Sequence, residues 1–432
     1  MKFTLTIFTI LFLFKISGQS IIFQQIYQCQ TDQSAREAIE ISSGGYMIAA
    51  MNEKSFGDTD IYILRTDING DTIWTKSFGG NFSEYPNMIL ETTGGNFLIL
   101  GYTKSFGAGN NDIYLIKIDI NGNILWTKSY GDIGDDEGKD IIATTDGNYI
   151  ITGRSNSPGN LNYDAFLKKI DPNGNILWEN NYGGNQYETS RSVKECIGGG
   201  YIIAGQTNSY GSGNGDVFLV RTDANGNFQW SKTFGGSNID DGNAVIENTD
   251  SSIIIAAETN SYGSGNMDVW VIKTDKNGNV VWDQTFGGID KDVSKTMRPT
   301  SDGGYIIGAI SRSFGWINPE MWLIKIDANG ILQWTRSFGS WDHEHCHSAR
   351  EVSDGGFISV GNSKSYGPVS KIMFIKLDQN GTTNLNANKT QNTFKIYPNP
   401  FQNTIKFCYK TENEEEIKIS LYGVDQKYIY QK

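Results

Sequence analysis

The sequence predicts an all-β protein, a seven-bladed β-propeller of four-stranded blades followed by a short C-terminal β segment. The first observation is a motif, Asp-Xaa-Asn-Gly, that recurs five times at a spacing of 52 residues and then once at 51. The second is composition, since 50 glycines with only 8 prolines indicate many short strands joined by tight turns. A period of this length is typical of a propeller or a solenoid, and four strand-like segments in each period favour the propeller.

Each copy of the motif has the chemistry of a tight hairpin turn. The aspartate can accept hydrogen bonds from the turn backbone, and the glycine takes the left-handed conformation of a bulge. The copies begin at Asp67, Asp119, Asp171, Asp223, Asp275, Asp327 and Asp378 and end at Gly70, Gly122, Gly174, Gly226, Gly278, Gly330 and Gly381. A tryptophan follows the first six copies, at Trp74, Trp126, Trp178, Trp230, Trp282 and Trp334.

One period shows the four predicted strands of a blade. We place them at 244–249, 253–258, 268–274 and 280–286, with the loop "TNSYGSGN" between the second and the third. Following the strand direction puts the Asp-Xaa-Asn-Gly turns on one face of the ring. The "TNSYGSGN" loops and the blade-to-blade linkers fall on the other face, which we call the linker face. Because the linker-face loops are longer and more variable, we expect function there.

The two ends of the array complement each other. After Gly381 the sequence "TTNLNA" supplies no tryptophan strand, whereas "SIIFQQIYQ", residues 20–28, places Phe23 at the tryptophan position. We therefore expect the N-terminal strand to form the outer edge of the seventh blade and to close the ring, which hides the sheet edges. The propeller is predicted to span residues 20–382.

The N-terminal residues 1–19 have the layout of a cleaved signal peptide. Lys2 precedes an apolar run from Phe3 to Phe14, which is too short to span a bilayer, and small polar residues follow. No later apolar run is long enough for a membrane span. We expect a protein that is secreted or displayed on the cell surface.

Charge and cysteine usage exclude two classes. A net charge of -12 and a pI near 4.9 argue against nucleic acid as a partner, because binding to phosphate backbones requires clustered Lys and Arg. Cys29, Cys196, Cys346 and Cys408 occupy unrelated repeat positions. A disulfide framework is therefore not expected.

Two families share motifs with the chain. The pattern "FGGSNIDDGNAV", then "DGGYII", then "DVWVIKTDKNGNVVW" resembles the secreted bacterial β-propeller repeat family, abbreviated SBBP. That resemblance implies export and a propeller but no defined reaction. A weaker similarity links "IDANGILQW" to the tryptophan-docking motif of quinoproteins.

The C-terminal residues resemble a different family. After a linker at 383–393, the segments "FKIYPNPFQNTIKF" and "EIKISLYGVDQKY" are similar to the C-terminal sorting domain of type IX secretion substrates in Bacteroidetes. Gln426 stands where that family usually has glycine. Residues 394–432 are thus interpreted as a partial sorting domain, which implies the type IX secretion machinery as a partner.

The stretch "WDHEHCHSAR", residues 341–350, contains all three histidines of the chain. We place it in the linker from the sixth blade to the seventh. His343, His345 and His347, with Cys346, are candidate ligands for zinc, because alternate residues of an extended segment lie about 6.6 Å apart and two neighbouring imidazoles could share a metal. The favoured alternative is that these are exposed polar linker residues without a bound metal.

Two columns of acidic residues recur on the linker face. One lies in the linkers, at Glu84, Asp136, Glu188, Asp240, Asp292 and Glu344, and the other opens the third strand, at Asp60, Asp112, Asp164, Asp216, Asp268 and Glu320. A group that nearly every blade repeats is predicted to satisfy backbone N–H groups of the linkers. Calcium at single blades is the alternative.

Residues that break the repeat are the better candidates for a specific ligand. The periodic tryptophans and the aromatics of "SFG" and "SYG" are expected to pack between blades. Trp316 and Trp341 fall outside the period, in loops of the linker face near the histidines. Trp316, Trp341 and Glu344 form the predicted ligand-binding patch.

These features favour a non-enzymatic binding or adhesion scaffold for an extracellular protein or polysaccharide, acting through the linker face without a cofactor. The alternative is an extracellular enzyme, glycan-active or dependent on a quinone or a metal. A quinoprotein should show an adjacent cysteine pair, which the sequence lacks. A glycosidase with two carboxylates stays open, because the sequence does not give the separations of its many acids.

Overall fold

The computed structural model describes residues 22–55, 57–157, 162–314 and 318–382, together with four strands near the C-terminus. The predicted signal peptide, residues 1–19, lies outside the described residues. The chain divides into two units, Met1–Thr383 and Asn384–Lys432, which are treated separately below.

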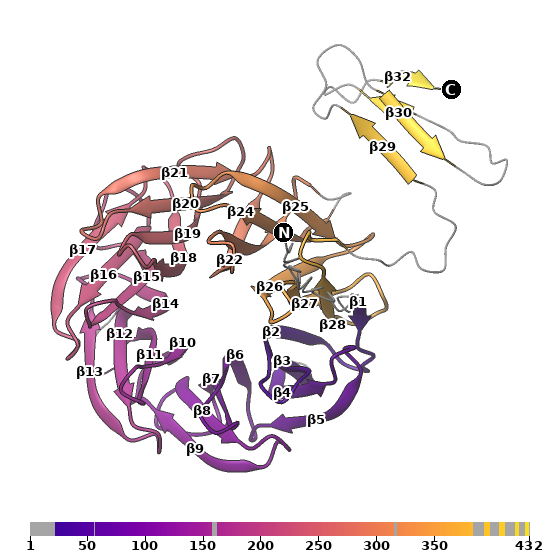
Figure 1. Ribbon diagram of the computed structural model, residues 1–432. Helices are drawn as coiled ribbons and strands as arrows, with labels where there is room; N and C mark the ends of the chain where they lie inside the picture. The colour runs from indigo at the N-terminus through magenta and orange to yellow at the C-terminus, as the bar shows by residue number, and fades with distance from the viewer. Residues whose placement is uncertain are drawn as a thin grey trace, which may run out of the picture. The chain divides into compact units, whose positions relative to one another are not determined.

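The first unit is a ring of seven four-stranded antiparallel sheets, which confirms the predicted propeller (Figure 1). Blades 1 to 3 consist of β2(Gln33–Glu40), β3(Tyr46–Ser55), β4(Asp58–Thr66), β5(Thr72–Phe78); β6(Glu84–Glu91), β7(Phe97–Thr103), β8(Asp112–Ile118), β9(Ile124–Tyr130); and β10(Asp136–Ala143), β11(Tyr149–Ser155), β12(Asp164–Ile170), β13(Ile176–Tyr182). Blades 4 and 5 consist of β14(Glu188–Glu195), β15(Tyr201–Thr207), β16(Asp216–Thr222), β17(Phe228–Phe234); and β18(Asp240–Glu247), β19(Ile253–Thr259), β20(Asp268–Thr274), β21(Val280–Phe286). Blade 6 consists of β22(Asp292–Pro299), β23(Tyr305–Ser311), β24(Glu320–Ile326), β25(Leu332–Phe338), and blade 7 of β26(Glu344–Glu351), β27(Phe357–Ser363), β28(Lys371–Leu377) and β1(Phe23–Ile26).

The first strand of each blade lies innermost, around the centre of the ring, and the fourth lies outermost (Figure 1). The innermost strand begins earlier than predicted, since β18 starts at Asp240 and not at residue 244. The reason is a β-bulge between Gly242 and Ala244, which lets the strand continue into residues that had been assigned to the linker. The predicted linker positions of His345 and His347 are wrong for the same reason, because β26 begins at Glu344, whereas His343 lies in the linker as predicted.

The Asp-Xaa-Asn-Gly turns have the predicted chemistry. In the first copy the Asp67 carboxylate accepts hydrogen bonds from the backbone N–H groups of Asn69 and Asp71, at 2.9 and 2.8 Å. Gly70 has a φ of 81°, in the left-handed region that favours glycine. These bonds hold the pKa of Asp67 below its usual value. The turn that joins the third and fourth strands of the blade thus has backbone N–H groups that are hydrogen-bonded by its own aspartate.

The N-terminal strand closes the ring as predicted. β1 pairs antiparallel with β28, with Phe23 opposite Lys376. Within the ring, Trp74 packs on Gly122 of the next blade, where a Cβ would lie 2.8 Å from the indole. Phe23 takes the equivalent place against Gly70 of blade 1, at 2.9 Å. Phe23 therefore packs in the position that a tryptophan occupies in the other blades, which confirms the predicted alignment of residues 20–28 with the tryptophan strands.

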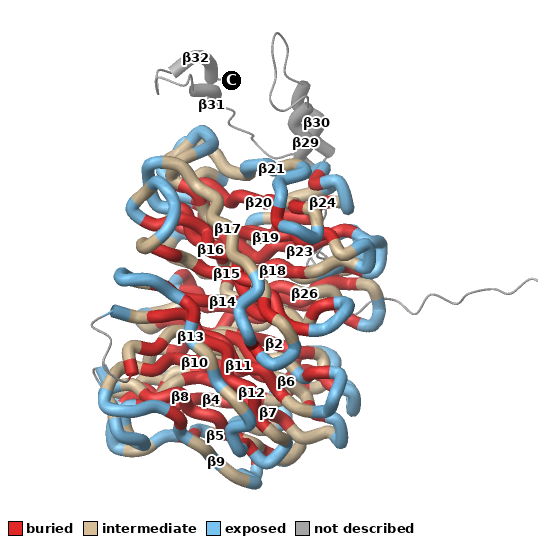
Figure 2. The backbone as a smooth tube through the Cα atoms, turned by 90° about the vertical axis from the view of Figure 1, so that its left-hand side faces the viewer, coloured by how far each residue is buried: buried red, intermediate tan, exposed pale blue. Residues whose placement is uncertain are grey.

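The core lies between neighbouring blades. Figure 2 shows buried residues along the strands and exposed residues in the loops. Each cluster of buried side chains combines two adjacent sheets, as where Leu100 of blade 2 and Ile151 of blade 3 pack around Tyr130. The aromatics that end the fourth strands belong to these clusters, since Phe78 and Tyr130 are buried and Phe234 and Phe286 pack against such clusters. Their predicted packing role is confirmed.

The second unit contains two antiparallel pairs. β29(Thr393–Tyr397) pairs with β30(Lys406–Lys410), and β31(Ser420–Tyr422) pairs with β32(Tyr428–Gln431). Within the part of the chain that the structure describes, no helix has the length and apolar character needed to cross a bilayer.

Candidate functional site

The acids of the linker column cap the linkers. Glu188 accepts hydrogen bonds from the Gly184 N–H at 2.7 Å and from the Thr207 hydroxyl at 2.7 Å. The same arrangement recurs at Glu84, Asp240, Asp292 and Glu344, each of which accepts from a linker N–H four residues earlier. The predicted structural role of this column is confirmed. Glu344, one of the predicted ligand-binding residues, is fully buried in this role.

The acids of the third-strand column meet the linker column across a glycine. A Cβ on Gly131 would lie 2.3 Å from Asp112 Oδ1 and 2.7 Å from Asp136 Oδ2, so only glycine fits between the two carboxylates. Burial and the nearby Asp136 raise the pKa of Asp112, and burial and Asp292 do the same for Asp268. Calcium at this column stays a prediction.

The histidine stretch lies in two different environments. His345 and His347 belong to β26, the innermost strand of blade 7, and their rings are 6.2 Å apart and nearly perpendicular. Cys346 stands between the two histidines in the sequence. Its side chain is fully buried and packs in the core with Met321 and Leu323 of blade 6. His343 precedes the strand and its Nδ1 lies 2.7 Å from Asp342 Oδ1. The structure therefore brings two of the four predicted metal ligands together.

The charges around these two histidines are cationic. His347 Nδ1 lies 3.4 Å from Arg36 Nη1, and its Nε2 lies 3.2 Å from Asn362 Oδ1. Burial and the cations Arg36 and Lys295 lower the pKa of His345 to about 4 and that of His347 well below 6.5. Burial raises the pKa of the Cys346 thiol to about 12. Among the described residues, no group of three or more His, Cys, Asp or Glu side chains is arranged to hold a metal ion, and the zinc site stays a prediction.

Of the three residues in the predicted ligand-binding patch, Trp341 is exposed to solvent. Trp341 lies in the linker before β26 and is 68% exposed, and its carbonyl accepts a hydrogen bond from the Asn318 side chain at 2.9 Å. Trp316 lies outside the described residues. Trp341 is part of a wider set of exposed apolar residues in the linkers, which also contains Phe82, Ile133, Ile239 and Ile289.

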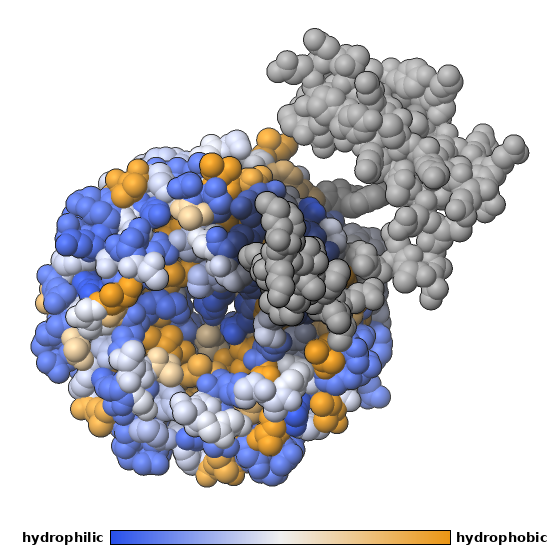
Figure 3. Space-filling model, viewed as in Figure 1, coloured by the Kyte–Doolittle hydropathy of each residue, from blue (hydrophilic) through white to orange (hydrophobic). Residues whose placement is uncertain are grey.

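The space-filling surface is predominantly hydrophilic, with scattered hydrophobic patches and a hollow at the centre of the ring (Figure 3). A second set of exposed aromatics comes from the loops between the second and third strands: Phe106, Tyr210, Tyr262, Phe314 and Tyr366. Four of them stack on a third-strand aromatic of their own blade, as Tyr210 does on Phe218 with ring centroids 5.9 Å apart. Tyr210 and Tyr262 also donate to the carbonyl of the preceding linker, and these loop aromatics cover the joints between blades.

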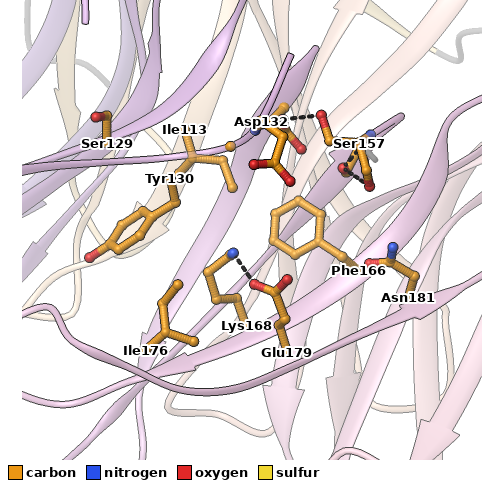
Figure 4. A pocket seen from close by; sticks show the side chains of 13 residues that line it. Ile113, Ser129, Tyr130, Asp132, Ser157, Phe166, Lys168, Ile176, Glu179 and Asn181 are labelled. Carbon is orange, nitrogen blue, oxygen red and sulfur yellow. Dashed lines mark hydrogen bonds and ion pairs between the residues drawn. The ribbon is translucent and has the colours of Figure 1, made fainter. Parts of the chain in front are cut away.

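A cavity of about 320 Å³ opens between blades 2 and 3, and sequence reasoning missed it. Its walls come from the outer strands of blade 2, from the linker at Gly131 and Asp132, and from all four strands of blade 3, and Figure 4 shows Phe166 among the lining side chains. In the loop of blade 3, "SNSPGN", Pro158 stands at the position of Tyr210. Phe166 therefore has no loop aromatic of that register to stack on. The substitution of proline for the repeated aromatic was the signal in the sequence.

The cavity is lined mainly by charged and neutral polar groups. Lys168 forms an ion pair with Glu179, and its ammonium lies 5.6 Å from the centre of the Tyr130 ring (Figure 4). The Ser157 hydroxyl donates to Asp136 at 2.8 Å. The exposed Asn181 lines the opposite wall. A volume above 300 Å³ lies in the range of small-ligand sites, and the lining of this cavity is more polar than that of most such sites.

Comparisons with known proteins show the fold. No protein-family model matches the chain. It is similar to the regulatory protein FlaEY of Caulobacter vibrioides, at 27% identity over 154 residues that cover 33% of this chain and only 15% of that protein. The structure of puromycin hydrolase is similar with a TM-score of 0.51 at 12% identity, covering 91% of this chain and 57% of the hydrolase. The Pan2 WD40 domain of Neurospora crassa gives 0.49 at 10% identity, covering 81% of this chain and 90% of the domain. At 12% identity the likeness to puromycin hydrolase is one of fold alone, and it agrees with the seven-bladed ring of sheets described above.

Proposed function

We propose that this propeller is an exported, non-enzymatic scaffold that binds an extracellular polysaccharide on its linker face, with the cavity between blades 2 and 3 as the primary site. The observation that carries the proposal is the cavity of about 320 Å³, which the polar side chains of Ser157 and Asn181 line together with the edges of Tyr130 and Phe166. In blades 2, 4, 5 and 6 the equivalent aromatic packs against an aromatic of its own loop, whereas Pro158 stands at that position of the repeat in blade 3.

The chemistry of the walls favours a sugar. An aromatic face packs against the C–H face of a pyranose, and hydroxyl, amide and carboxylate groups bond its hydroxyls. Phe166 and Tyr130 are almost fully buried and offer only their edges, so the polar groups of Ser157, Asn181 and Asp132 would make most of the contact. The exposed Trp341 and the other apolar linker residues would extend contact to further units of a chain.

Export is the second part of the proposal. The resemblance of the repeats to the SBBP family, and of residues 394–432 to type IX sorting domains of Bacteroidetes, supports a secreted or surface-displayed protein that leaves the cell by that route. Loss of residues 1–19 from the mature chain, read by N-terminal mass spectrometry, is the expected sign of signal cleavage.

The test is binding of the full chain to an array of bacterial and plant glycans. Pro158→Tyr restores the aromatic that the other loops carry at this position of the repeat and should abolish binding, and Asn181→Ala should weaken it. Thr233→Ala, at the position of Asn181 in blade 4, is the matched control and should bind as the wild type does.

Equal binding by the wild type and by both cavity variants would overturn this site. Cleavage of a bound glycan would favour the enzymatic alternative, and capture of protein in place of glycan would contradict the ligand class.

A further inference from the structure

The bulge on every innermost strand aims one side chain toward the centre of the ring. In each of these seven strands the register shifts by one residue, for example between Ala35 and Glu37 and between Ser294 and Thr296. The skipped residue is thereby released from the ladder and re-aimed. We call these skipped residues the bulge ring.

The bulge ring is cationic although the chain as a whole carries a net charge of -12. Four of its members are Arg36, Lys139, Arg191 and Lys295. The other three, Asn87, Asn243 and His347, are neutral polar residues, and none of the seven is acidic. All seven line one cavity of about 110 Å³ at the centre of the ring.

Two of the four cations have no carboxylate partner. Arg191 pairs with Asp241 at 2.5 Å, and Lys139 pairs with Glu137 at 2.6 Å. Within the described part of the chain, neither Arg36 nor Lys295 forms an ion pair with a carboxylate. Arg36 instead faces the Nδ1 of His347 at 3.4 Å and the sulfur of Met51 at 3.8 Å.

The surrounding charges increase this imbalance. Burial lowers the pKa of Lys139 and Lys295, and the cation Arg191 lowers both further. Glu258, the acid that interacts most strongly with Lys295, is itself buried, which raises its pKa. Glu37 and Asp140 also line the cavity, but among the described residues neither carboxylate forms an ion pair with Arg36 or Lys295. Partly desolvated cations that lack an ion-paired carboxylate gain most from a bound anion.

The side chains Asn87 and Asn243 keep the ring in place. Each amide donates to a backbone carbonyl of the next blade, Asn87 to Gly138 at 2.7 Å and Asn243 to Ser294 at 3.2 Å. The innermost strands are thus tied to each other beside the cations. A ligand that enters the cavity meets a preorganised set of donors, which reduces the entropy cost of binding.

We propose that the bulge ring binds a tetrahedral oxyanion of the sulfate or phosphate class between Arg36 and Lys295. The cavity has room for several water molecules, which suits such an ion and is too small for a sugar ring. The anion is either free or the charged substituent of a larger extracellular ligand. This site is separate from the cavity between blades 2 and 3 and does not depend on it.

The experiment is calorimetric titration of the full chain with sodium sulfate and sodium phosphate in a buffer of low chloride content. The wild type is expected to bind at millimolar concentration or below, and Lys295→Gln and Arg36→Gln should each weaken the affinity at least about tenfold. Lys276→Gln removes the same charge from an exposed turn residue of blade 5 and should bind as the wild type does.

Thermal unfolding supplies a second readout that does not depend on the affinity of the variants. Because Lys295→Gln relieves repulsion in the ring, its melting temperature without anion should equal or exceed that of the wild type. Added sulfate should then raise the melting temperature of the wild type and of Lys276→Gln but not that of Lys295→Gln.

Dextran sulfate and uncharged dextran separate the two sources of the anion. Binding of sulfate and dextran sulfate but not of dextran would identify the site as one for a charged substituent, and binding of inorganic sulfate alone would identify a free ion. Absence of binding by the wild type, or equal binding by Lys295→Gln and Lys276→Gln, would overturn the proposal.

Discussion

Glu40 accepts two hydrogen bonds from Ser353, one from its backbone N–H and one from its hydroxyl, both at 2.7 Å. The two residues lie 313 positions apart, at the end of the first innermost strand and in the first turn of blade 7. The same bonds join Glu195 to Thr145 and Glu351 to Ser301 between consecutive blades. The contact between blades 7 and 1, which closes the ring, therefore has the same hydrogen bonds as the contacts between other neighbouring blades.

Glu40→Ala is expected to destabilise the propeller about as much as Glu195→Ala does. Each substitution removes a carboxylate that accepts two bonds, worth about 1–3 kcal/mol for a charged acceptor and toward the lower end at an exposed joint. Unfolding in urea, followed by circular dichroism, measures both. If Glu40→Ala is silent while Glu195→Ala is not, the closing joint opens independently of the rest of the ring.

Gly70→Ala should be more destabilising than Gly44→Ala. Both glycines have a positive φ, 81° and 87°, so both substitutions incur the same backbone strain of about 1–2 kcal/mol. A Cβ at Gly44 meets no atom within 4 Å, whereas one at Gly70 would lie 2.9 Å from the Phe23 ring. The difference in unfolding free energy between the two variants therefore measures the packing of the N-terminal strand, and equal losses would contradict its role in closure.

Stability should decrease as the pH falls from 6.5 toward 4. The folded-state pKa of His345 is about 4, and that of His347 lies well below 6.5, whereas both titrate near 6.5 when the chain is unfolded. The unfolded state therefore binds more protons than the folded state in this pH range. The contribution of the two neutral imidazoles to the free energy of unfolding is complete above pH 6.5 and is lost as the pH falls, because protonation then favours the unfolded chain. Each histidine changes the free energy of unfolding by at most about 1.4 kcal/mol per pH unit.

His347→Gln should flatten this dependence, as measured by urea unfolding at several pH values between 6.5 and 5. The same variant measured above pH 6.5 is the control, because the wild-type imidazole is neutral there in both states. An unchanged slope would show that His347 is protonated in the folded protein.

The repeat sufficed to predict the blade architecture, because motifs such as Asp67 to Gly70 encode turns by local chemistry. The alignment of Phe23 with the tryptophans found the closing strand, because both must fill the same space above a turn glycine. The inner strand was misplaced, since a bulge such as the one at His347 changes register without a sequence signature. The bulge ring and the cavity at Phe166 were missed for a related reason: each depends on which residues from different blades meet.

Glu37 connects the stability of the ring with its charge. It is 3% exposed and pairs with Arg350 and, at 3.8 Å, with Arg298. Glu37→Gln would leave two partly buried guanidinium groups without their carboxylate, and the free energy of unfolding should fall by about 3 kcal/mol, the lower end of the range for a buried pair. The double variant Glu37→Gln, Arg350→Gln should recover part of that loss, because one unpaired cation is removed. Since Glu37 also lines the central cavity, the single variant should bind sulfate more tightly than the wild type does. Weaker sulfate binding by a folded Glu37→Gln protein would show that the cations act on the anion through their geometry and not through their net charge.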